Sequence, residues 1–488
     1  MSEIREAIRF PTPADTQMPA DQETRTFFIF FCRAILLVVS LLCAYILALQ
    51  IPDWRHGFSI PGALTQVLVV TALASGSAYL AVRARNATVV RILCEVAALA
   101  VVLVAVEVAT VAWTPNPKDA RALRQRAAAR LGLPFDSRQV SEVVRDLRSA
   151  GVDALPGLAF DWARLPEVRG HLPADLYPLS HASNAVVVAC NESGRYFTYR
   201  TDEWGFNNPP GLLDAGSIDV ALVGESYVLG FCLPAAQSFA ARIRERYPQT
   251  ANFALAGNRT DGQLGSFREF VEPIRPRVVL WAINPTFVVE NGNSRDPVLA
   301  RYLDPGFSQN LRAQQPEIDR LVRELAIPVQ VLLDRRAQAT QRDTRLMRYR
   351  QAWQLPETRS QLARVLGAHQ QGADGPDLTV FVQTLQLVKR TAEQWNGKLI
   401  VVLLPVYSEV VADQVQGNLR HDHLAKVVGN LGIPVVDGVD LFKQNPDPAA
   451  YFTLRINNHP TAEAYALLAG RVMKEIDAQL SGPAIAAR

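Results

Sequence analysis

Four residues between positions 226 and 459 have side chains or backbone groups suited to ester chemistry. Ser226, in the segment VGESY, supplies a hydroxyl, which is a weak nucleophile and needs a base beside it. His459, in the segment NNHP, carries the imidazole that most often acts as this base. Gly257 and Asn284 could offer a backbone N–H and a side-chain amide to a developing oxyanion. The four residue types predict acyl-transfer chemistry if the fold brings them together.

The elements around these residues predict how they are positioned. Short apolar runs predict strands over residues 218–223, 251–255, 277–283, 398–404 and 433–436. Amphipathic segments between the runs predict helices, and the last helix is expected over 461–480. Apolar strands that alternate with helices indicate a parallel sheet covered on both faces, which is a flavodoxin-like three-layer α/β fold. Sites in such sheets lie at the carboxyl ends of the strands, where all four residues are expected.

The order Ser, Gly, Asn, His at these positions resembles the SGNH (GDSL-type) hydrolase superfamily. The resemblance implies that Ser226 is the nucleophile, Gly257 and Asn284 bind the oxyanion and His459 is the catalytic base. Glu225 stands where the family usually has aspartate. The resemblance implies neither a cofactor nor a metal ion.

Three upstream and internal segments extend this resemblance to a bacterial membrane-anchored branch of the superfamily. They are CNESG from Cys190, TDEWGFNNP from Thr201, and the segment 302–319. This branch implies a fold and a cellular location rather than a substrate.

Two blocks of the sequence depart from the family pattern. The family usually has aspartate three residues before the histidine, where this chain has Ile456. The imidazole could instead be oriented by Asn457, Asn458 or Asp437, or Ser226 and His459 could act as a dyad. The third block usually reads Gly-x-Asn-Asp but here reads AINP, so Pro285 removes a backbone donor. A catalytically degenerate domain that only binds a ligand is therefore the alternative.

The N-terminal part of the chain is strongly apolar. Three stretches, over 27–49, 61–82 and 89–113, each reach the roughly 20 residues that cross a bilayer as a helix. Three consecutive transmembrane helices are expected, and three buried helices of a soluble protein are the alternative. Basic residues near the N-terminus and in the second loop favour a cytoplasmic N-terminus. The remainder would then face the periplasm of a bacterial inner membrane.

These patterns divide the chain into predicted regions. They are a cytoplasmic tail (1–26), the transmembrane helices (27–113), a juxtamembrane stalk and hairpin region (114–216) and an SGNH-like catalytic domain (217–480) with a helical insertion (292–375). The hairpin is predicted from strands over 185–190 and 195–200.

Charge and cysteine content narrow the functional classes. With 50 basic and 47 acidic residues, the net charge of +3 gives no footprint for nucleic acid. Five cysteines without a C-x-x-C pair exclude a zinc ribbon. Cys190 and Cys232, outside the apolar stretches, could form a disulfide in an oxidising compartment or remain free thiols.

The sequence thus predicts a membrane-anchored extracytoplasmic serine esterase or O-acyltransferase that works through an acyl-Ser226 intermediate. The resemblance implies acylated, especially acetylated, envelope glycans as substrates, and a transferase would need a membrane protein that supplies acyl groups. The alternative is a binding or scaffold protein of envelope polysaccharide assembly with a degenerate SGNH pocket.

Overall fold

The computed structural model describes residues 85–113, 119–214, 216–290, 296–350, 352–355, 377–412 and 419–481, with a few isolated residues between 26 and 83. The chain forms two compact units, of which the first comprises residues 1–114 and 348–369 and the second the remainder. The second unit holds Ser226, Gly257, Asn284 and His459.

Helix α3 (Asn86–Trp113) is the main described element of the first unit. Its segment Asn86–Val111 has a mean hydropathy of 2.6 and is long and apolar enough to cross a membrane. Its position matches the third predicted span. The other two predicted spans, over 27–49 and 61–82, lie almost entirely outside the described residues.

The second unit is built on a parallel five-stranded sheet, which confirms the predicted α/β class. Its strands are β4 (Val220–Val223), β5 (Thr250–Asn252), β6 (Val278–Ile283), β7 (Lys398–Leu403) and β8 (Val435–Asp437). Their order, β5-β4-β6-β7-β8, has the pattern of flavodoxin-like doubly wound sheets. Strand β5 is added on one side of β4, and β6 and the later strands are added on its other side. A crevice is therefore expected between the ends of β4 and β6.

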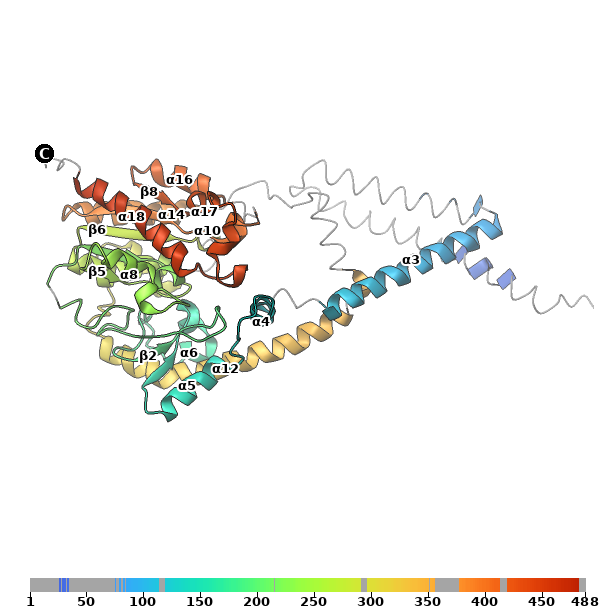
Figure 1. Cartoon of the computed structure of the whole chain (residues 1–488), viewed down its shortest axis with the longest axis horizontal. Coiled ribbons are helices and arrows are strands. Elements are labelled where there is room, and N and C mark those ends of the chain that lie inside the picture. Colours follow the sequence, from blue (N-terminus) through green and yellow to red (C-terminus); the bar gives the residue numbers. More distant parts are fainter. Residues whose placement is uncertain are drawn as a thin grey trace, which may run out of the picture. The chain divides into compact units, whose positions relative to one another are not determined.

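Alternate residues of each strand enter two separate cores, because successive side chains of a strand point to opposite faces. Val220 and Leu222 pack with Phe239 and Tyr465, whereas Ala221 and Val223 pack in the other core with Leu385 among others. The first face is covered by α8 (Phe239–Arg244), α17 (Gly438–Lys443) and α18 (Ala462–Ser481). The other is covered by α9 (Thr260–Ser266), α14 (Thr379–Glu393) and α16 (His421–Gly429). Figure 1 shows α8 and α18 on the same side of the sheet.

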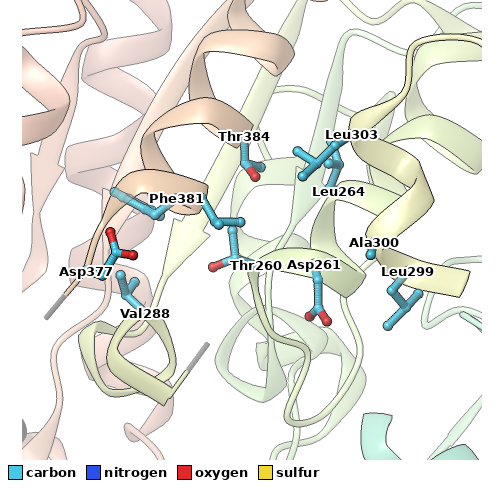
Figure 2. Close-up of a pocket in the computed structure, with 11 residues that line it drawn as sticks. Thr260, Asp261, Leu264, Val288, Leu299, Ala300, Leu303, Asp377, Phe381 and Thr384 are labelled. Carbon is cyan, nitrogen blue, oxygen red and sulfur yellow. The ribbon is translucent and has the colours of Figure 1, made fainter. Parts of the chain in front are cut away.

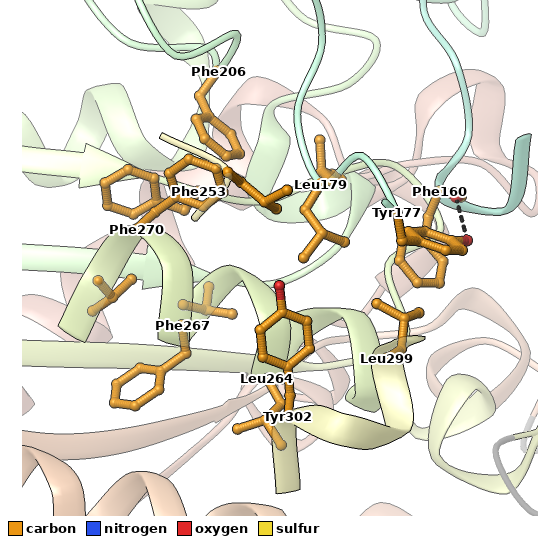
Figure 3. Packing of buried hydrophobic residues seen from close by; sticks show 14 of the residues in the cluster. Phe160, Tyr177, Leu179, Phe206, Phe253, Leu264, Phe267, Phe270, Leu299 and Tyr302 are labelled. Atoms are coloured by element: carbon orange, nitrogen blue, oxygen red, sulfur yellow. Dashed lines mark hydrogen bonds between the residues drawn. The ribbon is translucent and has the colours of Figure 1, made fainter. Parts of the chain in front are cut away.

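The region upstream of the sheet packs into the same core. Figure 3 shows Phe206 against Phe253 and Phe270, and the ring centroids of Phe206 and Phe270 are 4.8 Å apart, edge to face. Nearby, the hydroxyl of Tyr177 donates a hydrogen bond of 2.9 Å to the carbonyl of Phe160. Residues 119–214 therefore belong to the same compact unit as the sheet.

A small second sheet lies within this upstream region. Its strands are β1 (Ala154–Pro156), β2 (Val186–Val188) and β3 (Thr198–Arg200). The antiparallel pairing of β2 and β3 confirms the predicted hairpin. Strand β1, which pairs parallel to β2, was too short to be predicted from the sequence pattern. Two helices precede the sheet, α4 (Ala120–Arg130) and α5 (Val140–Ser149).

The predicted insertion is helical where it is described. It contains α11 (Pro297–Ala300) and the 36-residue helix α12 (Gln315–Arg350). The buried carboxylate of Glu269 accepts hydrogen bonds from the Tyr302 hydroxyl and from the backbone of Leu311, at 2.8 and 2.9 Å. These bonds fix the first part of the insertion to the helices of the sheet.

Short helices and turns complete the described elements. They are η2 (Phe160–Arg164), α6 (Pro166–Arg169), α7 (Ser226–Leu229), η3 (Ala235–Gln237), η4 (Phe267–Val271), η5 (Glu272–Ile274), α10 (Pro285–Glu290), η6 (Arg301–Leu303), η7 (Ala352–Gln354), α15 (Tyr407–Val410), η8 (Pro448–Tyr451) and η9 (Thr453–Arg455).

The TDEWGFNNP segment braces the sheet. Asp202 Oδ1 accepts hydrogen bonds from the backbone of Trp204 and Phe206, and Oδ2 accepts one from the Asn208 amide at 2.8 Å. The Asn208 side chain in turn accepts a bond of 2.8 Å from the backbone of Asn252 in β5. The neighbouring Asn207 amide donates to the carbonyl of Leu229, the last residue of α7. This motif therefore holds the helix that begins at Ser226.

We expect the Asp202→Ala substitution to lower the free energy of unfolding by about 2–4 kcal/mol, because it leaves buried donors without their charged acceptor. Urea unfolding of the full-length protein in detergent measures the change. Asp175→Ala, at an exposed position, is the matched control and should change stability little. Equal stability of the two variants would contradict this role for Asp202.

Candidate functional site

Ser226 lies at the reversal point of the sheet. It is the first residue of α7, and two residues separate it from the end of β4, while Asn284 directly follows the neighbouring strand β6. The turn between β4 and α7 requires glycine at position 224, because a Cβ there would lie 2.6 Å from Val228 Cγ2 and 3.3 Å from Ala282 Cβ. This close approach sets Ser226 at the carboxyl edge of the sheet.

His459 reaches the same edge from the loop before α18. Its backbone carbonyl accepts a hydrogen bond from Thr453, and its ring lies 4.9 Å from the ring centroid of Tyr227. His459 Nε2 is 2.8 Å from Ser226 Oγ. The structure thus brings together two residues that are 233 positions apart in the chain.

The group on the other side of the imidazole is Glu192, from the connection between β2 and β3. Glu192 Oε2 lies 2.9 Å from His459 Nδ1 and also accepts a bond of 2.6 Å from the His459 backbone N–H. With Nδ1–H donated to Glu192, the lone pair of Nε2 faces the serine hydroxyl, which is the arrangement of an acid–histidine–serine triad.

Glu192 was not among the residues predicted to orient the imidazole. Asp437 instead accepts hydrogen bonds from the backbone at the start of α17. Asn458 donates to the carbonyl of Thr453, and Asn457 lines the cavity beside Ser226. The sequence does contain an acid in the CNESG segment, at Glu192, two residues after Cys190. Its contact with the loop that carries His459, however, depends on the fold.

Arg124 completes the charged part of the site. Its guanidinium forms an ion pair with Glu192 Oε1, and its Nε donates a hydrogen bond of 3.0 Å to Asn458 Oδ1. Arg124 lies in α4, within the region that the sequence predicts as a juxtamembrane stalk. The predicted stalk region therefore contributes Arg124 to the site.

These contacts shift the pKa values of Glu192 and His459. Burial opposes ionisation of Glu192, but the positive charges of His459 and Arg124 outweigh it and lower the pKa of Glu192 to about 2. Burial alone would lower the pKa of His459, but the negative charge of Glu192 and its hydrogen bond prevail and raise that pKa above its ordinary value. Arg124 acts on His459 in the opposite direction. Glu192 is consequently a permanent anion near neutral pH.

Glu225 also contacts the serine hydroxyl. Its Oε2 is within hydrogen-bond distance of Ser226 Oγ, and its Oε1 is buried without a hydrogen-bond partner among the described residues. Burial raises the pKa of this carboxyl group, which favours the neutral acid. Because the serine hydroxyl has one proton, a neutral Glu225 can donate to Oγ while Oγ donates to His459.

An open cavity of about 260 Å³ surrounds Ser226. It is lined by Glu192, Glu225, Ser226, Tyr227, Asn284, Phe287, Val406, Ser408, Asn457, Asn458 and His459. Asn284 therefore shares the cavity with Ser226 and His459. Gly257 does not line it; this residue follows β5 with a φ of 71°, and its added Cβ would meet only the backbone of Phe160, at 4.0 Å.

Cys190 and Cys232 form a disulfide across 42 residues. Cys190 precedes Glu192 by two residues, and Cys232 follows Ser226 by six. Cys232 Sγ also lies 3.7 Å from His459 Nδ1. The bond thus links the two segments that carry the acid and the serine.

A second pocket, with an internal volume of about 40 Å³, lies between α9, α11 and α14. Figure 2 shows its lining, in which Leu264, Leu303 and Phe381 lie beside Thr260 and Asp261. Asp261 is paired with Arg164 at 3.0 Å. This pocket has no serine or histidine in its lining, so we place the candidate active site at Ser226.

Comparisons with known proteins add structural likenesses to solved structures. No protein-family model matches the chain, and no curated protein matches it. Among solved structures, it is similar to a protein assigned to the lipolytic G-D-S-L family from Desulfitobacterium hafniense DCB-2, with 12% identity and a TM-score of 0.30, over 53% of this chain and 99% of the other.

A second such structure, a member of the same family from Veillonella parvula DSM 2008, has 12% identity and a TM-score of 0.29, over 53% of this chain and 97% of the other. Similarity at this level carries no argument about function.

Replacing both Cys190 and Cys232 by alanine should lower the free energy of unfolding by about 2–4 kcal/mol, because a covalent link across a long loop restricts the unfolded chain. Urea unfolding measures the loss, and mass spectrometry under nonreducing conditions verifies the bond in the wild type. Cys94→Ala, at the free exposed cysteine, is the control. A double variant as stable as this control would contradict a stabilising role for the disulfide between Cys190 and Cys232.

Proposed function

We propose that the protein is a serine esterase or O-acyltransferase that forms an acyl-enzyme at Ser226. The observation that carries this proposal is the continuous chain of contacts from Glu192 through His459 to Ser226 in an open cavity. Each contact is within hydrogen-bond distance and has the polarity that a nucleophilic serine needs.

In the proposed reaction, Ser226 Oγ attacks the carbonyl carbon of an ester while His459 Nε2 takes the hydroxyl proton. The protonated imidazole is stabilised by the Glu192 carboxylate 2.9 Å away. His459 then gives the proton to the leaving alkoxide, which departs as an alcohol and leaves the acyl-serine. Water or another alcohol, deprotonated by the same imidazole, attacks the acyl group and regenerates Ser226.

The tetrahedral intermediates carry a negative charge on the former carbonyl oxygen, which needs donors. Asn284 is a side-chain donor suited to this role, because it directly follows β6, the strand beside β4, and lines the cavity with Ser226. On the basis of the family resemblance we assign the backbone N–H of Ser226 to the same role; Gly257, which does not line the cavity, is not assigned it. Glu225, if neutral, supplies a further hydrogen bond to Oγ and keeps it oriented toward His459.

The substrate that we propose is an acylated, most simply acetylated, glycan of the bacterial envelope. The openness of the cavity to solvent is compatible with a bulky polymer as the alcohol component. In a transferase, a partner membrane protein would supply the acyl group. The substrate proposal rests on the family resemblance and the polar lining of the cavity.

We further propose that the apolar N-terminal region anchors the protein in the inner membrane and that the second unit faces the periplasm. Helix α3, with its length and hydropathy, supports an anchor. The disulfide supports an oxidising compartment, because disulfides persist outside the reducing cytoplasm.

Ser226→Ala should abolish covalent labelling by a fluorophosphonate probe and lower the hydrolysis of p-nitrophenyl acetate by about 10³-fold or more, because the nucleophile is lost. Gel fluorescence and absorbance measure the two effects on the full-length protein. Ser408→Ala is the matched control, because this serine lines the same cavity, whereas His459 Nε2 contacts Ser226.

The same experiment tests the alternative of a binding protein with a degenerate site. Wild-type protein that neither reacts with the probe nor hydrolyses the ester faster than Ser226→Ala would favour that alternative. Labelling without hydrolysis would instead indicate a transferase that excludes water as acceptor.

The pH dependence of kcat/KM should show a limb set by His459. The raised pKa of His459 means that activity is lost as the pH falls through a value above 6.5, because only the neutral imidazole accepts a proton. Glu192→Gln should move this limb to lower pH and reduce the maximal rate by roughly 10²–10⁴-fold.

Arg124→Gln provides the opposing control, because loss of its positive charge should move the limb to higher pH. Ester hydrolysis between pH 5 and 9 measures both shifts. Limbs at the same pH in all three proteins would contradict the assignment of His459 as the base.

A further inference from the structure

A second cluster of ionisable side chains lies outside the Ser226 cavity, at the end of β8. His421, the first residue of α16, lies 3.1 Å from Asp440 Oδ1 and 3.8 Å from Asp437 Oδ2 through its Nε2 atom. Its Nδ1 atom lies 2.5 Å from Glu409 Oε1. The four residues come from four separate elements, α15, α16, β8 and α17.

The hydrogen-bonding pattern fixes the polarity of the His421 ring. Glu409 is buried, and the same oxygen that faces Nδ1 also accepts a bond from the His421 backbone N–H at 3.1 Å. Nδ1 is therefore the protonated donor of the ring. In a neutral imidazole, the lone pair of Nε2 would then face two carboxylate oxygens, which are also acceptors. A positive charge makes this arrangement favourable, and either a second ring proton on Nε2 or a metal ion in its place can supply it.

The spacing of the three atoms fits a metal ion. Bonds of about 2.1 Å from nitrogen and oxygen to a tetrahedral metal place the ligand atoms roughly 3.4 Å apart. The distances of 3.1 and 3.8 Å from His421 Nε2 bracket this value, and all three ligand atoms lie within 4.8 Å of one another. Small side-chain rotations would bring them into coordination distance.

The surroundings of the cluster are also those of a metal site. Asp437 Oδ1 is held by the backbone N–H groups of Val439 and Asp440, so that Oδ2 is left toward His421. The contact of Nδ1–H with the buried Glu409 is the carboxylate–histidine arrangement that orients a metal-binding imidazole. The Asp440 side chain is 69% exposed, which leaves an entry path for an ion and room for water ligands.

We propose that His421 Nε2, Asp437 Oδ2 and Asp440 Oδ1 bind a first-row divalent metal ion, for which Zn²⁺ is the test ion, with Glu409 orienting the imidazole. One imidazole nitrogen and two carboxylate oxygens are ligands that such ions accept. In this proposal the metal site is structural. Helix α15 carries Glu409 and also contains Ser408, and it follows Val406 directly. Val406 and Ser408 both line the Ser226 cavity. The ion would hold this wall in place and take no part in the ester chemistry.

The proposal is tested by zinc uptake of the full-length protein in detergent after removal of metal with a chelator. Equilibrium dialysis against buffered Zn²⁺ should give one ion per wild-type chain. Asp440→Asn should weaken the affinity by about tenfold or more, because a neutral amide oxygen replaces a charged carboxylate ligand. This exposed position is chosen since its variant is expected to fold. His421→Gln should abolish uptake at this site.

Asp422→Asn is the matched control, because Asp422 is exposed and its carboxylate accepts from the backbone of His423 rather than facing Nε2. It should bind zinc like the wild type, and zinc should raise the unfolding temperature of the wild type and of this control more than that of Asp440→Asn. Wild-type protein without zinc uptake, or uptake as tight in Asp440→Asn as in the wild type, would overturn the proposal. Because the readout is binding, the result is independent of whether Ser226 is a nucleophile.

Discussion

The candidate site depends on one buried carboxylate, that of Glu192. This anion holds both the ring Nδ1–H and the backbone N–H of His459, and it is itself paired with Arg124. An ionised group of this kind is costly to bury unless its partners neutralise it, and removing one partner from such a pair typically costs about 3–5 kcal/mol. The position of the imidazole relative to Ser226 is therefore coupled to the folding of the upstream region.

Much of the fold could be predicted because local patterns of apolar residues indicate its strands and helices. Short runs of apolar residues such as 218–223 and 398–404 gave the positions of β4 and β7, since strands that are buried on both faces need apolar side chains throughout. The ends of parallel strands meet at one edge, and this rule alone indicated that Ser226 and Asn284 would be neighbours. His459 could be placed from its position just before the last helix.

The acid of the site could not be predicted in the same way. Glu192 belongs to the connection of a different, smaller sheet, and no periodicity relates this connection to the loop that carries His459. The sequence instead directed attention to Asp437, which follows an apolar run but binds the backbone of α17. Arg124 was missed for a related reason: the composition of α4 is that of a solvated helix, and only the tertiary contact shows that one of its arginines is turned inward.

The position of Arg124 in the chain has a consequence for how the protein can be dissected. Only six residues separate the end of α3 at Trp113 from the start of α4 at Ala120. A fragment that begins after α4 would lack both the apolar helix α3 and Arg124. The Glu192 carboxylate would then lose the guanidinium group that pairs with it. Crystallisation or screening of such a minimal domain would report on an altered electrostatic environment, so the cut belongs before Asp119, whose side chain caps this helix.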